Sequence, residues 1–232
     1  MVMKIAYIAP KSMAKHTVAG DFHFVIPQNA TDWYKDSRNF KMLDNGAYEG
    51  KAIRMQELLD IARALKVDEV VIPDVIGNAK KTLENIRSLR KAIAQEFKVA
   101  AVPQGQTVTE FLECFKVVSC MDDIDTICFP KWLSLTRPAV VHHLRQSKQL
   151  SYKFEYHLMG LDNPAELFLY RGQDIRSVDT SMPFTYAYHY RTIELFEPVY
   201  LTRVPMRQQF DRKQLELLER NFKVLNDVVR TL

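Results

Sequence analysis

Short β-branched, apolar runs alternate along this chain with amphipathic stretches, and this alternation constrains the fold more than any other feature. From the third run onward most runs lie about 20 to 30 residues apart, the spacing of a strand followed by a helix. The candidate strands are residues 4–9, 22–26, 41–43, 69–72, 99–102, 126–129, 156–159 and 175–178. Eight strands with helices between most of them predict an α/β fold, a compact (β/α)8 TIM-type barrel in one domain over residues 1–232.

The stretches between the runs have helical periodicity. Helices are predicted over residues 55–65, 79–97, 109–118 and 138–150, and another is predicted to begin after Asn163 as N-cap, with Pro164 at its first position. Residues 10–22 are too few and too polar for a standard crossover helix, so the first units fit a barrel least well. An open doubly wound sheet is the alternative, although no glycine-rich phosphate loop follows the first run.

The C-terminal helix, predicted over residues 211–230, carries apolar residues in alternating steps of three and four. These residues are Leu215, Leu218, Phe222, Leu225 and Val229. Such a stripe forms either a dimer seam or a face docked on its own domain, and a pattern of barely two heptads favours the docked helix. The sequence leaves the oligomeric state open.

The composition indicates the cellular compartment in which the chain is expected. With 232 residues, 47% of them hydrophobic, the chain can bury a substantial core. No apolar run approaches the roughly 20 residues that span a bilayer, and the N-terminal segment lacks the apolar region of a secretion signal. Cys114, Cys120 and Cys128 have no close pair, so we expect small core residues rather than a disulfide or a zinc site. A cytoplasmic protein without a membrane partner is expected.

Three aspartates, Asp44, Asp74 and Asp179, directly follow predicted strands. The carboxyl ends of barrel strands form the mouth at which these folds carry their chemistry. A buried carboxylate is costly unless it is paired or hydrogen-bonded, and helix capping is the simplest explanation for one. Capping explains Asp44 and Asp179 less well, because glycine or proline turns follow them. Two carboxylates that face each other across a pocket suit glycosidic-bond chemistry.

Polar and aromatic residues at the other strand ends fit a purine. Asp74 and Gln104 suit the reading of a purine edge, because a carboxylate accepts hydrogen bonds and an amide both donates and accepts. Tyr48 offers a stacking face. Gly105 and Gly160 lie in turns at the same ends, where glycines permit close approach.

Basic residues near this mouth permit a nucleic-acid partner. Lys131, Trp132 and Arg137 follow the sixth run and form either a phosphate- and base-contacting loop or a solvated loop with a half-buried tryptophan. Arg203 and Arg207 make the C-terminal approach basic, which favours nucleic acid. The net charge of +4 permits a polyanionic partner but does not demand one.

Taken in order, these segments resemble the queuine and archaeosine tRNA-guanine transglycosylases, (β/α)8 barrels that exchange a guanine base. Residues 44–49 (Asp-Asn-Gly-Ala-Tyr-Glu) are similar to the family's Asp-Ser-Gly-Gly-Phe-Gln, and Asp74 matches its base-reading aspartate. Residues 102–105 match its Val-Gln-Gly-Gly turn with one residue inserted, and residues 159–161 match its Gly-Gly-Leu turn. Residues 179–183 match the nucleophile motif, an aspartate followed four residues later by proline.

The resemblance implies a role for each matching residue. Asp179 is implied to be the nucleophile that attacks C1′ and forms a covalent sugar–enzyme intermediate. Asp44 is implied to be the general acid and base. No metal and no redox cofactor is implied. The residues implied in base binding are Tyr48, Asp74, Gln104, Gly105 and Gly160.

One departure from the family shifts the expected substrate. The tRNA enzymes carry a CxCxxC…H zinc site after the nucleophile, whereas all three cysteines of this chain precede Asp179. A compact chain without that subdomain is similar to the phage DNA deoxyguanine transglycosylases, which replace guanine in DNA with 7-deazaguanine derivatives and protect phage genomes from restriction. DNA and a free 7-deazaguanine base are the implied partners, in the host cytoplasm. The alternatives are the same chemistry on tRNA and a non-catalytic barrel that binds nucleic acid or a purine.

Overall fold

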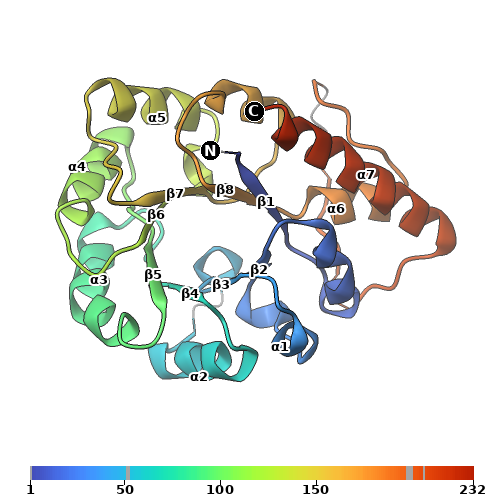
Figure 1. The fold of residues 1–232 in the computed structure, drawn as a ribbon, viewed down its shortest axis with the longest axis horizontal. Helices are drawn as coiled ribbons and strands as arrows, with labels where there is room; N and C mark the ends of the chain where they lie inside the picture. Colours follow the sequence, from blue (N-terminus) through green and yellow to red (C-terminus); the bar gives the residue numbers. More distant parts are fainter. Residues whose placement is uncertain (1, 51–52, 197–200, 206) are drawn as a thin grey trace.

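The computed structural model describes residues 2–50, 53–196, 201–205 and 207–232. Eight parallel strands form one sheet that curves around a central axis, with helices on its outside (Figure 1). The strand order is β1-β8-β7-β6-β5-β4-β3-β2. An isolated parallel bridge between Ala6 and Phe22 joins the two edge strands, so the barrel is nearly closed. The predicted α/β fold, a (β/α)8 TIM-type barrel, is confirmed.

Seven of the eight strands lie close to their predicted positions. The strands are β1 (Lys4–Tyr7), β2 (His23–Val25), β3 (Lys41–Leu43), β4 (Glu69–Val71), β5 (Lys98–Ala101), β6 (Thr126–Phe129), β7 (Glu155–Leu158) and β8 (Ser177–Thr180). The prediction of residues 175–178 for β8 is wrong by two residues, because Ile175 belongs to a turn in which its N–H donates to the Gln173 carbonyl at 2.9 Å. Asp179 therefore lies within β8 rather than after it.

Helices of regular length cover only part of the barrel. The α-helices are α1 (Trp33–Asp36), α2 (Met55–Leu65), α3 (Ala79–Ile93), α4 (Val108–Val118), α5 (Arg137–Gln146), α6 (Met182–Tyr188) and α7 (Arg212–Arg230). The 3-10 helices are η1 (Lys11–Ala19), η2 (Pro27–Asn29), η3 (Ala47–Glu49), η4 (Lys131–Leu133) and η5 (Pro164–Tyr170). The polar segment after β1 forms η1, and the helix predicted to begin at Pro164 is η5, so both units use a tighter helix than a standard crossover.

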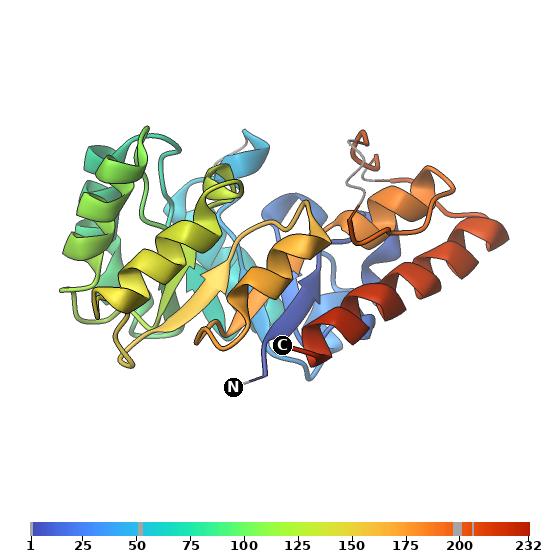
Figure 2. The ribbon, with the colours of Figure 1, turned by 90° about the horizontal axis from the view of Figure 1, so that it is seen from above.

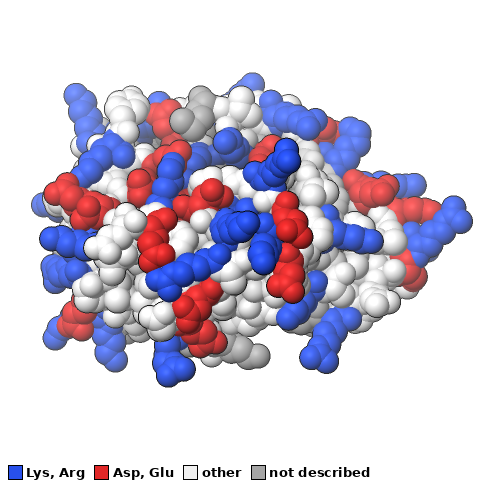
Figure 3. Space-filling model, turned by 60° about the horizontal axis from the view of Figure 1, so that its bottom comes forward, with Lys and Arg blue, Asp and Glu red and all other residues white. Residues whose placement is uncertain are grey.

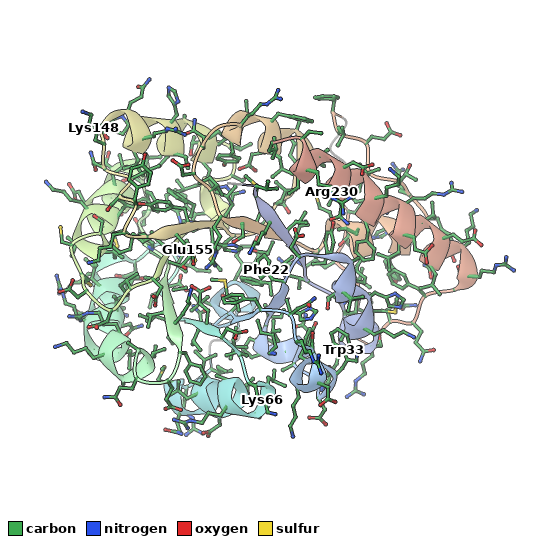
Figure 4. The ribbon with its side chains drawn as sticks, in the orientation of Figure 1. Phe22, Trp33, Lys66, Lys148, Glu155 and Arg230 are labelled. Carbon is green, nitrogen blue, oxygen red and sulfur yellow. The ribbon has the colours of Figure 1, made fainter. Side chains whose placement is uncertain are left out.

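Alternate residues of the strands face the barrel interior, because side chains on a strand alternate between its two faces. The middle of the interior is apolar and includes Phe22, Phe24 and Cys128. Its amino-terminal end is charged: Arg176 donates to Glu69 at 2.9 Å and to Glu155 at 2.7 Å. Figure 4 shows Phe22 and Glu155 toward the centre of the barrel, with Arg230 outside it.

Helix α7 packs along the outside of β1 and against α6 (Figure 2). The rings of Tyr7 and Phe222 lie 4.5 Å apart, and the Tyr7 hydroxyl donates to Asn226 at 2.8 Å. Asp211 and Gln214 form a capping box at the start of the helix. The apolar stripe is therefore used inside this chain, as the docked-helix interpretation predicts.

The surface of the described residues carries charges of both signs. No described helix is long and apolar enough to cross a membrane. On the face shown in Figure 3, basic and acidic side chains are interspersed rather than separated by sign.

Cys114 and Cys128 are buried as predicted, but the prediction is wrong for Cys120, which is exposed in the turn after α4.

Candidate active site

A pocket of about 740 Å³, its open mouth included, lies at the carboxyl ends of the strands. Because all eight strands are parallel, the residues that follow them meet at this one end. The side walls are largely apolar, with Phe24, Ile26 and Val102 among them. The residues predicted from sequence that line this pocket are Asp44, Tyr48, Asp74, Gln104, Lys131, Trp132, Gly160, Asp179 and Arg203.

Three of the predicted residues, Gly105, Arg137 and Arg207, are not part of the pocket lining. Gly105 is buried against α4, where a Cβ would lie 2.5 Å from the Phe111 backbone nitrogen. The close approach of that helix explains the glycine, and the implied contact with a base is not supported. Arg207 is exposed on the surface and does not line the pocket.

The prediction that Arg137 contacts nucleic acid is wrong. Arg137 is the first residue of α5, and its side chain is 0% exposed because the guanidinium packs against the residues that follow β7. It donates to Glu166 at 2.8 Å and to the backbone carbonyls of Met159 at 2.7 Å and Gly160 at 3.2 Å. Arg137 therefore supports the turn that lies at the pocket edge.

Replacing Arg137 by methionine should destabilise the protein by about 3–5 kcal/mol, because it leaves the buried Glu166 carboxylate without its positive partner and with only the Tyr170 hydroxyl as a donor. Urea unfolding followed by circular dichroism measures the difference. The control is Arg212→Met, which removes an exposed pair with Glu216 and should cost less than about 1 kcal/mol. Equal stabilities of the two variants would show that the buried pair does not support the fold.

Among the described helices, none is capped by the side chain of Asp44, Asp74 or Asp179. Helix α3 is capped instead by Asn78, which accepts from the Lys81 N–H. Helix α6 has Ser181 at its N-cap without a side-chain hydrogen bond. The Asp44 carboxylate accepts from the N–H of Gly46, which has a left-handed φ of 75°, so Asp44 fixes its own turn. Helix capping therefore does not account for these carboxylates in the pocket.

Asp179 is held on one oxygen by two donors. Its Oδ1 accepts from the Gly160 N–H at 3.0 Å and from His157 Nε2 at 3.0 Å. Gly160 has a left-handed φ of 65°, and a Cβ there would lie 2.8 Å from the Lys131 side chain. The Gly160 amide is thus directed at Asp179 rather than at a base, which changes the role implied for it.

His157 is a site residue that the sequence reasoning missed. It is the polar residue of the β7 run, and it faces the interior along with Met159, two positions later, which lines the pocket. Because alternate residues of a strand share a face, the position of His157 two residues before Met159 could have indicated that it faces the interior. Burial lowers the pKa of the imidazole, against the opposing hydrogen bond to Asp179, so the ring is neutral at neutral pH.

Asp74 lies in a cluster of amide groups. Its carboxylate accepts from Asn45 Nδ2 at 2.7 Å and from Gln104 Nε2 at 2.5 Å. Trp132 Nε1 donates to Gln104 Oε1 at 3.0 Å, which fixes the orientation of that amide. Burial raises the pKa of the Asp74 carboxyl, and the two amide hydrogen bonds oppose the shift. These hydrogen bonds hold the polar groups of the cluster in fixed orientations at the pocket.

Tyr48 lies at the rim of the pocket and is 51% exposed. Lys131 Nζ lies 5.1 Å from the centre of its ring, and the Arg203 guanidinium carbon lies 5.0 Å from it. Lys131 also pairs with Asp162 at 2.8 Å. An exposed aromatic ring can stack on a base, and the two cations beside it can contact a phosphate.

No protein-family model matches this chain, and no curated protein matches it. Within the described residues no group of three or more histidine, cysteine, aspartate or glutamate side chains is placed to hold a metal ion. The chemistry of the pocket and the order of its motifs therefore carry the functional argument.

Proposed function

We propose that this protein is a base-exchange glycosyltransferase that replaces guanine in DNA with a 7-deazaguanine derivative. The observation that carries the proposal is one pocket lined by Asp44 and Asp179 beside the cluster of Asp74 and Gln104. Two carboxylates at one pocket provide a nucleophile and a proton donor, which are the two groups that glycosidic exchange requires.

In the first step a carboxylate oxygen of Asp179 bonds to C1′ of the sugar as the bond from C1′ to N9 of guanine breaks. The bonding electron pair goes to the base, and Asp44 supplies the proton that makes guanine a neutral leaving group. The product is a covalent ester between the sugar and Asp179.

In the second step the incoming base reverses this sequence. Its N9 transfers a proton to the Asp44 carboxylate and bonds to C1′. The bond from C1′ to Asp179 breaks, and its electron pair returns to the carboxylate. One glycosidic bond is broken and one is formed, so the exchange needs no oxidant or reductant.

The buried amide cluster suits a guanine-like edge. Guanine and 7-deazaguanine carry N–H donors that a carboxylate such as Asp74 accepts, and an oxygen that an amide N–H such as that of Gln104 contacts. Ionised Asp74 is the form that accepts from two base N–H groups. Burial raises the pKa of Asp74, and hydrogen bonds that a bound base donates to it would favour the ionised form.

A nucleic acid is the proposed partner, because the rim offers Lys131 and Arg203 close to the exposed Tyr48 ring. DNA is proposed rather than tRNA, because no cysteine follows Asp179 to form the zinc site of the tRNA enzymes. The target guanine must leave the base stack to reach the pocket, which costs a few kcal/mol in a duplex and less in a single strand. Single-stranded DNA is therefore the better substrate to test first.

Radiolabelled guanine incubated with the protein and either single-stranded DNA, duplex DNA or unmodified tRNA tests the proposal. We expect label to enter DNA, faster in single strands, and a free 7-deazaguanine base to displace guanine in the same assay. Label in tRNA alone would establish the tRNA alternative. Binding of guanine without incorporation into either polymer would establish the non-catalytic barrel.

A further inference from the structure

A chain of hydrogen bonds crosses the barrel interior and ends on Asp179. Arg176 Nε lies 3.1 Å from Ser177 Oγ, and Ser177 Oγ lies 2.9 Å from His157 Nδ1. His157 Nε2 then lies 3.0 Å from Asp179 Oδ1. These groups are buried, so the contacts are not shared with bulk solvent.

The chemistry of its last member fixes the direction of the chain. An ionised carboxylate can only accept, so His157 Nε2 carries the ring proton and donates to Asp179. In a neutral ring Nδ1 is then the acceptor, and Ser177 Oγ donates its hydrogen to it. Ser177 Oγ in turn accepts from Arg176, because a guanidinium can only donate.

The surroundings of His157 hold its ring in this orientation. Phe24 stacks on it at 5.3 Å between centroids and 14° between planes, and Phe22 approaches edge-on at 6.2 Å. Burial lowers the pKa of the imidazole, so it donates as a neutral ring rather than as an imidazolium. Arg176 is itself anchored by Glu69 and Glu155.

We propose that His157 is a positioning residue that, with the Gly160 N–H, holds Asp179 Oδ1 and leaves Oδ2 as the oxygen that attacks C1′. This inference rests on the proposed function, in which Asp179 is the nucleophile. Two donors on Oδ1 restrain rotation of the carboxylate, so Oδ2 keeps the line of attack.

The same two donors act in the second half of the reaction. After attack by Oδ2, Oδ1 becomes the carbonyl oxygen of the sugar ester. Negative charge returns to this carboxylate as the incoming base displaces it, and donors that are already in place stabilise that charge. His157 therefore contributes to both formation and breakdown of the intermediate.

A pair of amide substitutions separates this role from simple packing. The amide nitrogen of glutamine can reach the place of Nε2, whereas the shorter asparagine can replace only Nδ1. We expect His157→Gln to keep kcat for base exchange within about tenfold of the parent. We expect His157→Asn to lower kcat about 10²-fold, with the KM for the free base changed less than about threefold. The matched control is the same pair of changes at His142, which is exposed on α5 and should leave the rate unchanged.

Equal rates for the two His157 variants, or a loss that appears only in KM, would overturn the positioning role while leaving the proposed function intact. A wild-type protein that exchanges no base would instead overturn the proposed function and the role of His157 with it. The geometry is tested independently by nitrogen NMR of the imidazole. We expect a neutral ring protonated on Nε2, with a proton resonance that moves in Asp179→Asn. A ring protonated on Nδ1, or a charged ring at neutral pH, would contradict the inference whether or not exchange occurs.

Discussion

Asp179→Asn should abolish base exchange, by about 10⁴-fold or more, and should also abolish the covalent DNA adduct. An amide oxygen is a far weaker nucleophile than a carboxylate, so the bond to C1′ does not form. The fold should survive, because the amide oxygen of asparagine can still accept from Gly160 and His157. Denaturing gels of the protein with labelled, guanine-containing DNA measure the adduct, and release of guanine measures exchange.

Asp174→Asn is the matched control for this experiment. Asp174 lies five residues earlier, is exposed and is 4.0 Å from Arg145, away from the pocket. Its substitution should leave both adduct and exchange at the parent level. Exchange near the parent rate in Asp179→Asn would assign the nucleophile to another residue and remove the main support for the proposed mechanism.

That the strand-end residues meet in one pocket could be predicted from the sequence, because the topology of a parallel barrel requires it. Once the strand and helix rhythm indicates a parallel barrel, residues that follow strands must meet at one end. Asp44, Asp74 and Gln104 were placed in the pocket by this reasoning. The same logic gives no distances and no hydrogen-bond partners, since these depend on how the strands are staggered.

The register of β8 could not be predicted because its inward face is polar. Hydrophobicity located the strand at Ile175, which lies in a turn, whereas Ser177 and Asp179 occupy the inward positions of the actual strand. A strand that carries part of a polar network departs from the apolar pattern on which strand prediction depends. His157 was missed although β7 was located, because the sequence reasoning considered only the residues at the strand ends.

Arg137 shows a second limit of sequence reasoning. A basic residue that follows a strand in a loop is typical of a surface contact, and only its partner reveals that it is buried. That partner, Glu166, lies 29 residues away, and the pair meets because α5 and η5 pack together. Gly105 is similar, since the contact that requires glycine comes from the folded position of α4.

Asp44→Asn should slow exchange about 10²–10⁴-fold, which corresponds to ~3–5 kcal/mol of transition-state stabilisation. Asparagine cannot give guanine a proton, so the base must leave as an anion. It also cannot accept the proton of the incoming base, so any adduct that forms should persist when free base is added. Single-turnover gels with a chase of free base measure both steps.

A substrate that needs no proton separates the two carboxylates. Guanine methylated at N7 is cationic in DNA and leaves as a neutral base without proton transfer. With this DNA, Asp44→Asn should form the adduct at a rate within about tenfold of the parent, because the acid is no longer required. Asp179→Asn should remain inactive, because the nucleophile is still absent. If the methylated substrate fails to restore adduct formation in Asp44→Asn, then Asp44 does not act as the acid, and the proton must reach the leaving base from another group at the pocket.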